Sequence, residues 1–276
     1  MTKVDLHVHT TASDGILTPQ ELIDHAILNE IKIIAITDHD TVSGIDSALE
    51  YSESKPVKVI PGIELSIDWK PGRLHIVGLN IDHNNDGLNQ ELKELEQHRK
   101  QRAEKITQEL QKCGISIEYQ EVVKEAKGGT IGKPHIARIL VKNGYVKSMD
   151  EAFANFFGTG LPGHVKKAKI PTPKAIKLIL DAGGIPILAH PASLCINQKE
   201  KFESFVEEFI SLGGMGIEVY AYMHTDEQVQ MYFDIANNKK MLITGGSDFH
   251  GDKNETIGYY GKERPIPYSL IEYLPF

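Results

Sequence analysis

Residues 4–9, VDLHVH, alternate apolar and polar side chains near the start of the chain. Successive side chains of a β-strand point to opposite faces, so His7 and His9 share one face and Val4, Leu6 and Val8 share the other. A lone His-X-His pair on a strand is more often two ordinary imidazoles than a functional site. The stretch therefore predicts a first strand, and the rest of the chain decides what its histidines face.

Six further apolar, β-branched runs follow, separated by helical patterns. This alternation is typical of parallel βα units, and 276 residues suffice for one α/β-barrel core. The seven expected strands are Val4–His9, Ile33–Asp38, Val57–Glu64, Leu74–Leu79, Ile185–His190, Gly216–Tyr220 and Met241–Ser247.

Helix signals punctuate the strands, except in one long segment. Capping boxes begin at Thr18 and Thr225, and Thr172-Pro173 opens another helix. Between Leu79 and about Pro171 the pattern is helical and rich in charge, without a convincing strand. We expect a helical insertion over residues 84–168, between the fourth and fifth strands, and a barrel over residues 1–83 and 169–276. Insertions of this kind leave a barrel at its loop end, where active sites lie.

Composition and charge limit the function classes. A net charge of −8 argues against a broad electrostatic grip on duplex DNA. No run approaches the eighteen or so apolar residues of a membrane span. Because the first strand pattern begins at Val4, we expect no signal peptide. Cys113 and Cys195 have neither metal-type nor redox-type spacing. We expect a cytoplasmic protein that binds neither membranes nor duplex DNA, and its oligomeric state stays open.

Nine residues that can bind metal fall at or near the ends of the expected strands, where a parallel barrel would bring them to one face. They are His7, His9, Asp14, His39, Glu64, His75, His190, Asp248 and His250. Burying three carboxylates together without cations would cost several kcal/mol per ion, so we interpret the set as metal ligands. Four other histidines are expected to be solvated and receive no role: His25, His83, His98 and His224.

Five motifs closely resemble those of PHP-domain phosphoesterases. They are Asp5–Thr10 followed by Ser13-Asp14-Gly15, then Thr37–Asp40, Pro61–Glu64, Ala189-His190-Pro191 and Gly246–His250. Residues 132–138, GKPHIAR, resemble one branch of that family. The branch contains nucleoside 3′,5′-bisphosphate phosphatases and a related ribonuclease that trims RNA from its 5′ end.

The resemblance implies a distorted (β/α)7 PHP barrel with three divalent metal ions. By this resemblance His7, His9, Glu64 and Asp248 hold the first metal, Asp14, His39 and His250 the second, and Glu64, His75 and His190 the third. Imidazole and carboxylate ligands without thiolate suit Mn²⁺, Fe²⁺ or Zn²⁺, of which we expect Mn²⁺. Asp14 and His39 are candidate catalytic residues, together with Asp38 and Asp40, which flank His39 and are candidates for orienting it.

The insertion is expected to bind a second phosphate of the substrate. Pro134 begins a helix there, so backbone N–H groups and the His135 and Arg138 side chains lie together. The resemblance implies that this segment holds the 5′-phosphate. The alternative interpretation is an ordinary capped helix with an arginine on its surface. Lys133 stands where the branch typically has Arg, and Lys lacks the bidentate fork. His164, with nearby lysines, either rims the same cleft or belongs to a solvated loop.

We therefore expect a metal-dependent phosphohydrolase that removes the 3′-phosphate of nucleoside 3′,5′-bisphosphates, trims short RNA from the 5′ end, or does both. The expected nucleophile is a metal-bound hydroxide, because phosphate-monoester hydrolysis needs an acceleration of up to about 10²¹. The residue that protonates the leaving ribose oxygen stays open. One alternative is a phosphatase of another small monoester such as histidinol phosphate, which needs no second phosphate site. A non-catalytic, metal-binding PHP module is the other.

Overall fold

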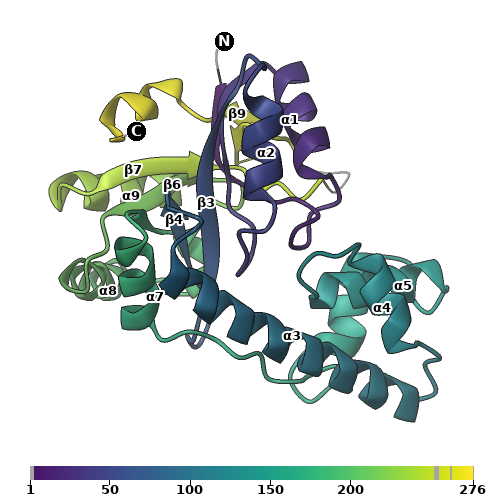
Figure 1. Ribbon diagram of the computed structural model, residues 1–276. Helices are drawn as coiled ribbons and strands as arrows, with labels where there is room; N and C mark the ends of the chain where they lie inside the picture. The colour runs from purple at the N-terminus through teal and green to yellow at the C-terminus, as the bar shows by residue number, and fades with distance from the viewer. Residues whose placement is uncertain (1–2, 252–254, 262, 276) are drawn as a thin grey trace.

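A computed structural model describes residues 3–251, 255–261 and 263–275 (Figure 1). Its framework is a seven-stranded sheet in the order β1-β2-β3-β4-β5-β6-β7. The strands are β1 (Lys3–Val8), β2 (Ile31–Ile36), β3 (Lys58–Ile67), β4 (Leu74–Leu79), β5 (Ile185–Leu188), β6 (Gly216–Ala221) and β7 (Leu242–Gly246). A parallel bridge between Val8 and Phe249 brings the two edges together, so the sheet forms a nearly closed barrel. The predicted seven-stranded α/β barrel is confirmed.

The direction of one strand corrects the expected all-parallel arrangement. β4 runs antiparallel to both β3 and β5, while the other neighbouring strands pair in parallel. The reason is the connection between β3 and β4, because the chain from Ile67 to Leu74 is too short for a parallel crossover. A hairpin therefore replaces one βα unit, and this is the distortion of the barrel.

The barrel's own helices begin where the capping signals place them. Thr18 and Thr225 both form reciprocal capping boxes, and the predicted start at Thr172 is also confirmed. The helices are α1 (Pro19–Leu28), α2 (Ile45–Ser52), α7 (Thr172–Asp181), α8 (Lys199–Ser211) and α9 (Asp226–Asn238). Two 3₁₀ segments, η2 (Pro191–Leu194) and η3 (Tyr268–Tyr273), and a small hairpin of β8 (Tyr259–Tyr260) and β9 (Arg264–Pro265) complete it.

The chain between β4 and β5 is helical up to α7, as expected. It contains α3 (Asp86–Lys112), α4 (Tyr119–Glu125), α5 (Lys133–Lys142), α6 (Met149–Ala152) and the π-helical η1 (Phe153–Phe157). Figure 1 shows α3 running from the barrel to a separate group that includes α4 and α5. We call α3 to η1 the insertion; its predicted limits at residues 84–168 stay a prediction. No helix of the described chain has the length and apolarity needed to cross a membrane.

Helix α3 belongs to two hydrophobic cores. Near its N-terminus, Leu88, Leu92 and Leu95 pack into the core between the sheet and α7, α8 and α9. Further along, Ile106 and Leu110 pack into a second core with α4, α5 and α6. One continuous helix therefore carries the rest of the insertion and fixes its position beside the barrel.

Candidate metal centre

The strand ends bring all nine predicted ligands together, and we call these nine residues the ligand centre. His7 and His9 come from β1 and the residue just beyond it, Glu64 from β3 and His75 from β4. His190 and Asp248 follow β5 and β7, and both have positive φ, of 24° and 56°. A non-glycine residue rarely adopts such a backbone, and residues that do so cluster at functional sites.

One group consists of three buried side chains and the half-buried Asp248. His7, His9, Glu64 and Asp248 each offer a nitrogen or oxygen atom, and these atoms lie within 4.8 Å of one another. His9 Nε2 lies 3.1 Å from Asp248 Oδ1, and His7 Nε2 lies 3.4 Å from Glu64 Oε2. The same four residues were predicted to hold the first metal.

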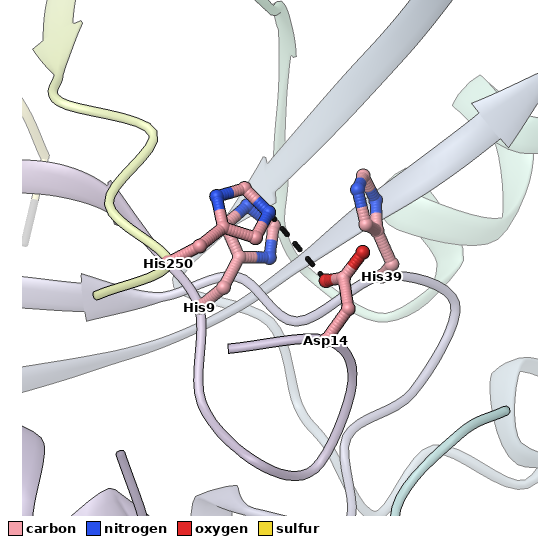
Figure 2. A group of neighbouring side chains, drawn as sticks. All are labelled: His9, Asp14, His39 and His250. Carbon is pink, nitrogen blue, oxygen red and sulfur yellow. Dashed lines mark ion pairs between the residues drawn. The ribbon is translucent and has the colours of Figure 1, made fainter. Parts of the chain in front are cut away.

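A second group lies beside it (Figure 2) and contains His9, Asp14, His39 and His250. His250 Nε2 is 3.5 Å from Asp14 Oδ1, and the rings of His9 and His250 stack with centroids 4.1 Å apart. The predicted second set lacked His9, which the geometry places between the two groups.

Glu64 is the centre of a third group. Its Oε1 lies 2.7 Å from His75 Nδ1 and 2.9 Å from His190 Nε2, and its Oε2 lies 2.7 Å from His39 Nδ1. The atoms that fall within one ion's reach belong to His39, Glu64 and His75. His190 contacts the same oxygen of Glu64 as His75 does, whereas the predicted third set had His190 where this group has His39.

Several buried polar atoms of the ligand centre lack hydrogen-bond partners within the protein, and metal ions could satisfy them. Six buried polar side-chain atoms of the described chain have no hydrogen bond of acceptable geometry. Five belong to the ligand centre: His7 Nε2, His9 Nδ1, Asp14 Oδ1, His39 Nδ1 and Glu64 Oε2. Buried polar atoms without partners are costly, and metal coordination satisfies such atoms. The donors are imidazoles and carboxylates without thiolate, a set that suits Mn²⁺, Fe²⁺ and Zn²⁺.

The imidazoles of the ligand centre differ in their pKa values, so some are neutral and some are charged at neutral pH. Burial and the neighbouring His250 lower the pKa of His9 to about 3, and burial lowers the pKa of His75 to about 4. Burial would also lower the pKa of His250, but Asp14 and Asp248 raise it to about 10. His9 and His75 therefore present lone pairs at neutral pH, whereas His250 must release a proton when a metal binds.

A cavity of about 320 Å³ opens onto the centre. Six of the predicted ligands line it, and the insertion closes the opposite side with Pro134, Arg138 and Phe153 among others. Arg138 also donates to the backbone oxygen of Asp14, which ties α5 to the ligand-bearing loop after β1. The cavity thus lies between the ligand centre and the N-terminal part of α5.

The other predicted phosphate-binding residues lie outside the lining of this cavity. His135 is buried, and its Nδ1 accepts a hydrogen bond from Gly132 N at 3.0 Å, which caps α5. Lys133 donates to Phe157 O at 2.9 Å, and burial together with Arg102 lowers its pKa to about 8. His164 is exposed and lines a different hollow of the insertion.

Comparison with known proteins agrees with this geometry. Residues 5–159, more than half of the chain, match the PHP domain family. The chain belongs to the PHP-domain family. It is similar to a 5′-3′ exoribonuclease from Haemophilus influenzae, at 36% identity over 90% of each chain. It is also similar to a 3′,5′-nucleoside bisphosphate phosphatase from Chromobacterium violaceum, at 31% identity over 96% of this chain and 94% of that one.

Its fold matches a solved structure described as a metal-dependent phosphoesterase, from Bifidobacterium adolescentis. The TM-score is 0.87 at 28% identity, over 98% of this chain and 94% of that one. This PHP-domain protein is therefore an enzyme, a metal-dependent phosphoric ester hydrolase.

Two carboxylates that support the PHP-domain ligands were missed in the sequence. Glu218 accepts hydrogen bonds from His7 Nδ1 at 3.0 Å and from His190 N at 2.7 Å. The first bond turns His7 Nε2 toward the centre, which is how a second carboxylate orients a metal-binding imidazole. Asp5 accepts hydrogen bonds from Ser247 and Gly258. Glu218 interrupts the apolar run 216–221, a polar residue in a buried strand, and this signal could have identified it.

Asp38 and Asp40 hold loops rather than line the cavity. Asp38 accepts from Thr10 N, Thr10 Oγ1 and Ser13 Oγ, at 2.5–2.8 Å, and so shapes the loop before Asp14. Asp40 accepts from Ser66 N at 2.8 Å and forms ion pairs with Arg99 and Lys167. Both contacts fix the backbone on either side of His39.

The prediction that His224 is solvated is wrong. His224, expected to be solvated, is only 3% exposed, and its Nδ1 donates to Val219 O at 2.8 Å. It sits at the end of β6, near Glu218, where the preceding apolar run enters the core. His98 is exposed, whereas His25 and His83 are half-buried.

Proposed function

We propose that the enzyme removes the 3′-phosphate from nucleoside 3′,5′-bisphosphates and trims short RNA from the 5′ end. The observation that carries this proposal is the single cavity between the ligand centre and Arg138 of the insertion. A cavity with metal ligands at one wall and a guanidinium at the other suits a substrate with two phosphates. The two relatives named above act, by their names, on these two kinds of substrate.

The proposed cofactors are three divalent ions, with Mn²⁺ the expected metal. His7, His9, Glu64 and Asp248 would hold one, Asp14, His39 and His250 another, and Glu64, His75 and His190 the third. When bound, such ions lower the pKa of water to about 7 and neutralise phosphate oxygens. The buried atoms without partners and the absence of thiolates among the nine ligands support this assignment.

The protein's own part in the reaction is positioning. Arg138 would bind the 5′-phosphate, and its link to the Asp14 backbone would set the distance between that phosphate and the ligand centre. Glu218 would hold His7 and His190 in place, and Asp38 would hold the loop that carries Asp14. A cytoplasmic location belongs to the same proposal, and the two free, exposed cysteines suit a reducing compartment.

The test is a direct assay with Mn²⁺ on a nucleoside 3′,5′-bisphosphate, a 5′-phosphorylated RNA trinucleotide and histidinol phosphate. We expect nucleoside 5′-monophosphate and inorganic phosphate from the bisphosphate, and little turnover of histidinol phosphate. Faster hydrolysis of histidinol phosphate, or release of the 5′-phosphate, would contradict the proposal.

A variant of the insertion tests the second phosphate site. Arg138→Ala should raise KM for the bisphosphate about ten- to a hundredfold, because a charge-assisted hydrogen bond contributes about 1.5–3 kcal/mol. Lys142→Ala, which removes an exposed cation from the end of the same helix, is the matched control and should leave KM unchanged. An equal KM for the two variants would remove the 5′-phosphate site from α5.

A further inference from the structure

Arg73 lines the cavity from the barrel side, in the turn of the β3–β4 hairpin just before β4. Its backbone is fixed, because Arg73 N donates to Ser193 O at 2.7 Å and Ser193 Oγ donates to Arg73 O at 2.9 Å. Ser193 Oγ also lies 3.0 Å from His190 Nδ1. The hairpin is therefore attached to the same loop that carries a residue of the ligand centre.

The Arg73 side chain differs from the other arginines of the chain. The sequence contains five, and four of them bind a protein oxygen: Arg99 binds Asp40, Arg102 binds Val165 O, Arg138 binds Asp14 O, and Arg264 binds Asp226. Arg73 is exposed, and within the part of the chain that the structure describes its guanidinium has no hydrogen bond or ion pair. It thus keeps its donors available toward the cavity.

Two arginines line the cavity, Arg73 and Arg138, and a bisphosphate has only one phosphate away from the ligand centre. In the proposed function one phosphate lies at the ligand centre and the other at Arg138, which leaves Arg73 without a substrate group. A guanidinium binds a phosphodiester through two parallel N–H···O bonds. We propose that Arg73 binds the phosphate that follows the scissile one in an RNA chain, in the 3′ part of the chain that keeps the scissile phosphate when the bond to the ribose 3′-oxygen of the first nucleotide breaks. This inference rests on the proposed function.

Room for the following nucleotide exists on the same side. Met223 lines the cavity and also a neighbouring open hollow of about 740 Å³, which Tyr222 lines as well. Met223 and Tyr222 are 38% and 37% exposed, and side chains of this kind offer apolar surface on which a base can lie without sequence preference. The segment η2 links the two regions, because Ser193 holds the Arg73 backbone and Ala192 N donates to Nε2 of His224, the neighbour of Met223, at 3.5 Å.

Two carboxylates outside the ligand centre, Glu255 and Asp150, also line the cavity and bear on an anionic substrate. Glu255 already accepts hydrogen bonds from the backbone N of His250 and of Gly251, at 2.6 and 2.9 Å. Asp150 lies on α6, in the insertion, and therefore on the Arg138 side of the cavity. Neither belongs to the hairpin, so Arg73 is the cation that lines the cavity on the hairpin side.

The experiment compares two substrates across four proteins. Values of kcat/KM are measured with Mn²⁺ for a nucleoside 3′,5′-bisphosphate and for a 5′-phosphorylated RNA trinucleotide. The proteins are the wild type, Arg73→Ala, Arg73→Lys and the control Lys70→Ala. Lys70 is an exposed cation of the same hairpin that does not line the cavity.

For Arg73→Ala we expect the loss on the trinucleotide to exceed the loss on the bisphosphate by about tenfold or more, mainly through KM. Arg73→Lys should lose less, and Lys70→Ala should change neither value. Equal losses on both substrates, or no loss on either, would overturn the inference. A wild type that cleaves the bisphosphate but not RNA would overturn it while leaving the phosphatase proposal intact. A wild type that cleaves neither would overturn both.

Discussion

At the scale of single residues, Glu64 organises the ligand centre. Its two oxygens face five histidines, which come from β1 and the residue just beyond it, from the loop after β2, from β4 and from the end of β5. No other carboxylate among the described residues is shared in this way by the candidate metal groups. The centre therefore depends on Glu64 more than on any one imidazole.

Replacing Glu64 by Gln should remove metal and activity together. The amide keeps the shape of the side chain but loses the charge that attracts cations, so we expect at least one fewer bound metal per chain. Activity should fall about a thousandfold or more, corresponding to ~4 kcal/mol of lost transition-state stabilisation. Elemental analysis and steady-state kinetics measure the two effects, with exposed Glu50→Gln as the control. Full metal content with full activity would show that Glu64 is not a ligand.

Glu218 should act on the metals without touching them. Glu218→Gln weakens the acceptor that orients His7 and His190, and loss of such outer contacts typically costs ten- to a hundredfold in metal affinity. Titration with Mn²⁺ measures the change. A lower melting temperature with unchanged Mn²⁺ affinity would instead mean that Glu218 serves folding alone.

His224 should make stability depend on pH. Burial lowers its pKa to about 4, from an ordinary value of 6.5 in the unfolded chain. The unfolded state therefore binds more protons between these values, and stability falls as the pH decreases from about 6.5 toward 4. The full effect amounts to about 3 kcal/mol at 1.36 kcal/mol per pKa unit.

Denaturant unfolding of the wild type and of His224→Gln, between pH 4 and 7.5, measures this contribution. The variant should be less stable at neutral pH, with a weaker dependence on pH. Parallel curves for the two proteins would assign the acid sensitivity to other groups.

At the scale of elements, α3 and the loop after β2 are joined by a buried ion pair. Burial raises the pKa of Asp40, but Lys167 and Arg99 outweigh it and hold that pKa far below its usual range. Asp40 thus stays charged, one residue away from His39. The pair connects the helix that carries the insertion to a segment of the ligand centre.

Arg99→Met should destabilise the fold by about 3 kcal/mol, because removing one partner leaves a buried charge incompletely compensated. Lys100→Met changes an exposed residue of the same helix and should shift the free energy of unfolding by less than about 0.5 kcal/mol. Chemical denaturation measures both variants. Equal stabilities would mean that Lys167 alone satisfies Asp40.

The sequence predicted the elements better than their directions. Apolar runs and capping boxes located all seven strands and the first turns of α1, α7 and α9, because burial and caps are local properties. The direction of β4 is not local, and the run 74–79 reads the same in either orientation. Only the short connection from Ile67 to Leu74 carries that information, because it leaves no room for a crossover helix.

At the scale of the whole molecule, metal binding should be coupled to stability. Ions that bind only the folded chain stabilise it by about 2.7 kcal/mol at a free concentration of one hundred times Kd. Removal of metal by EDTA should therefore lower the melting temperature by about 5–10 °C, and Mn²⁺ should restore it. The same melting temperature before and after verified metal removal would contradict this coupling.

The ligand centre was predictable because strand ends meet at one face of a barrel, whatever their exact register. Arg73 and Glu218 were not predicted, for two different reasons. Arg73 reaches the cavity only because a hairpin folds toward η2, a tertiary contact that no local pattern shows. Glu218 is a polar residue within an apolar strand, but its partner His7 lies 211 residues away in the sequence, so no local pattern pairs them.

The shared position of α3 in two cores has a consequence for access to the cavity. Beyond Gly87, in its first turn, the helix has no glycine or proline, so it offers no ready hinge between the barrel and the insertion. If the insertion moved away from the barrel, α3 would have to bend while its side chains stay packed in both hydrophobic cores. The width of the entrance to the cavity is therefore fixed by the folded structure. It selects substrates by their size, without a step in which the entrance opens or closes.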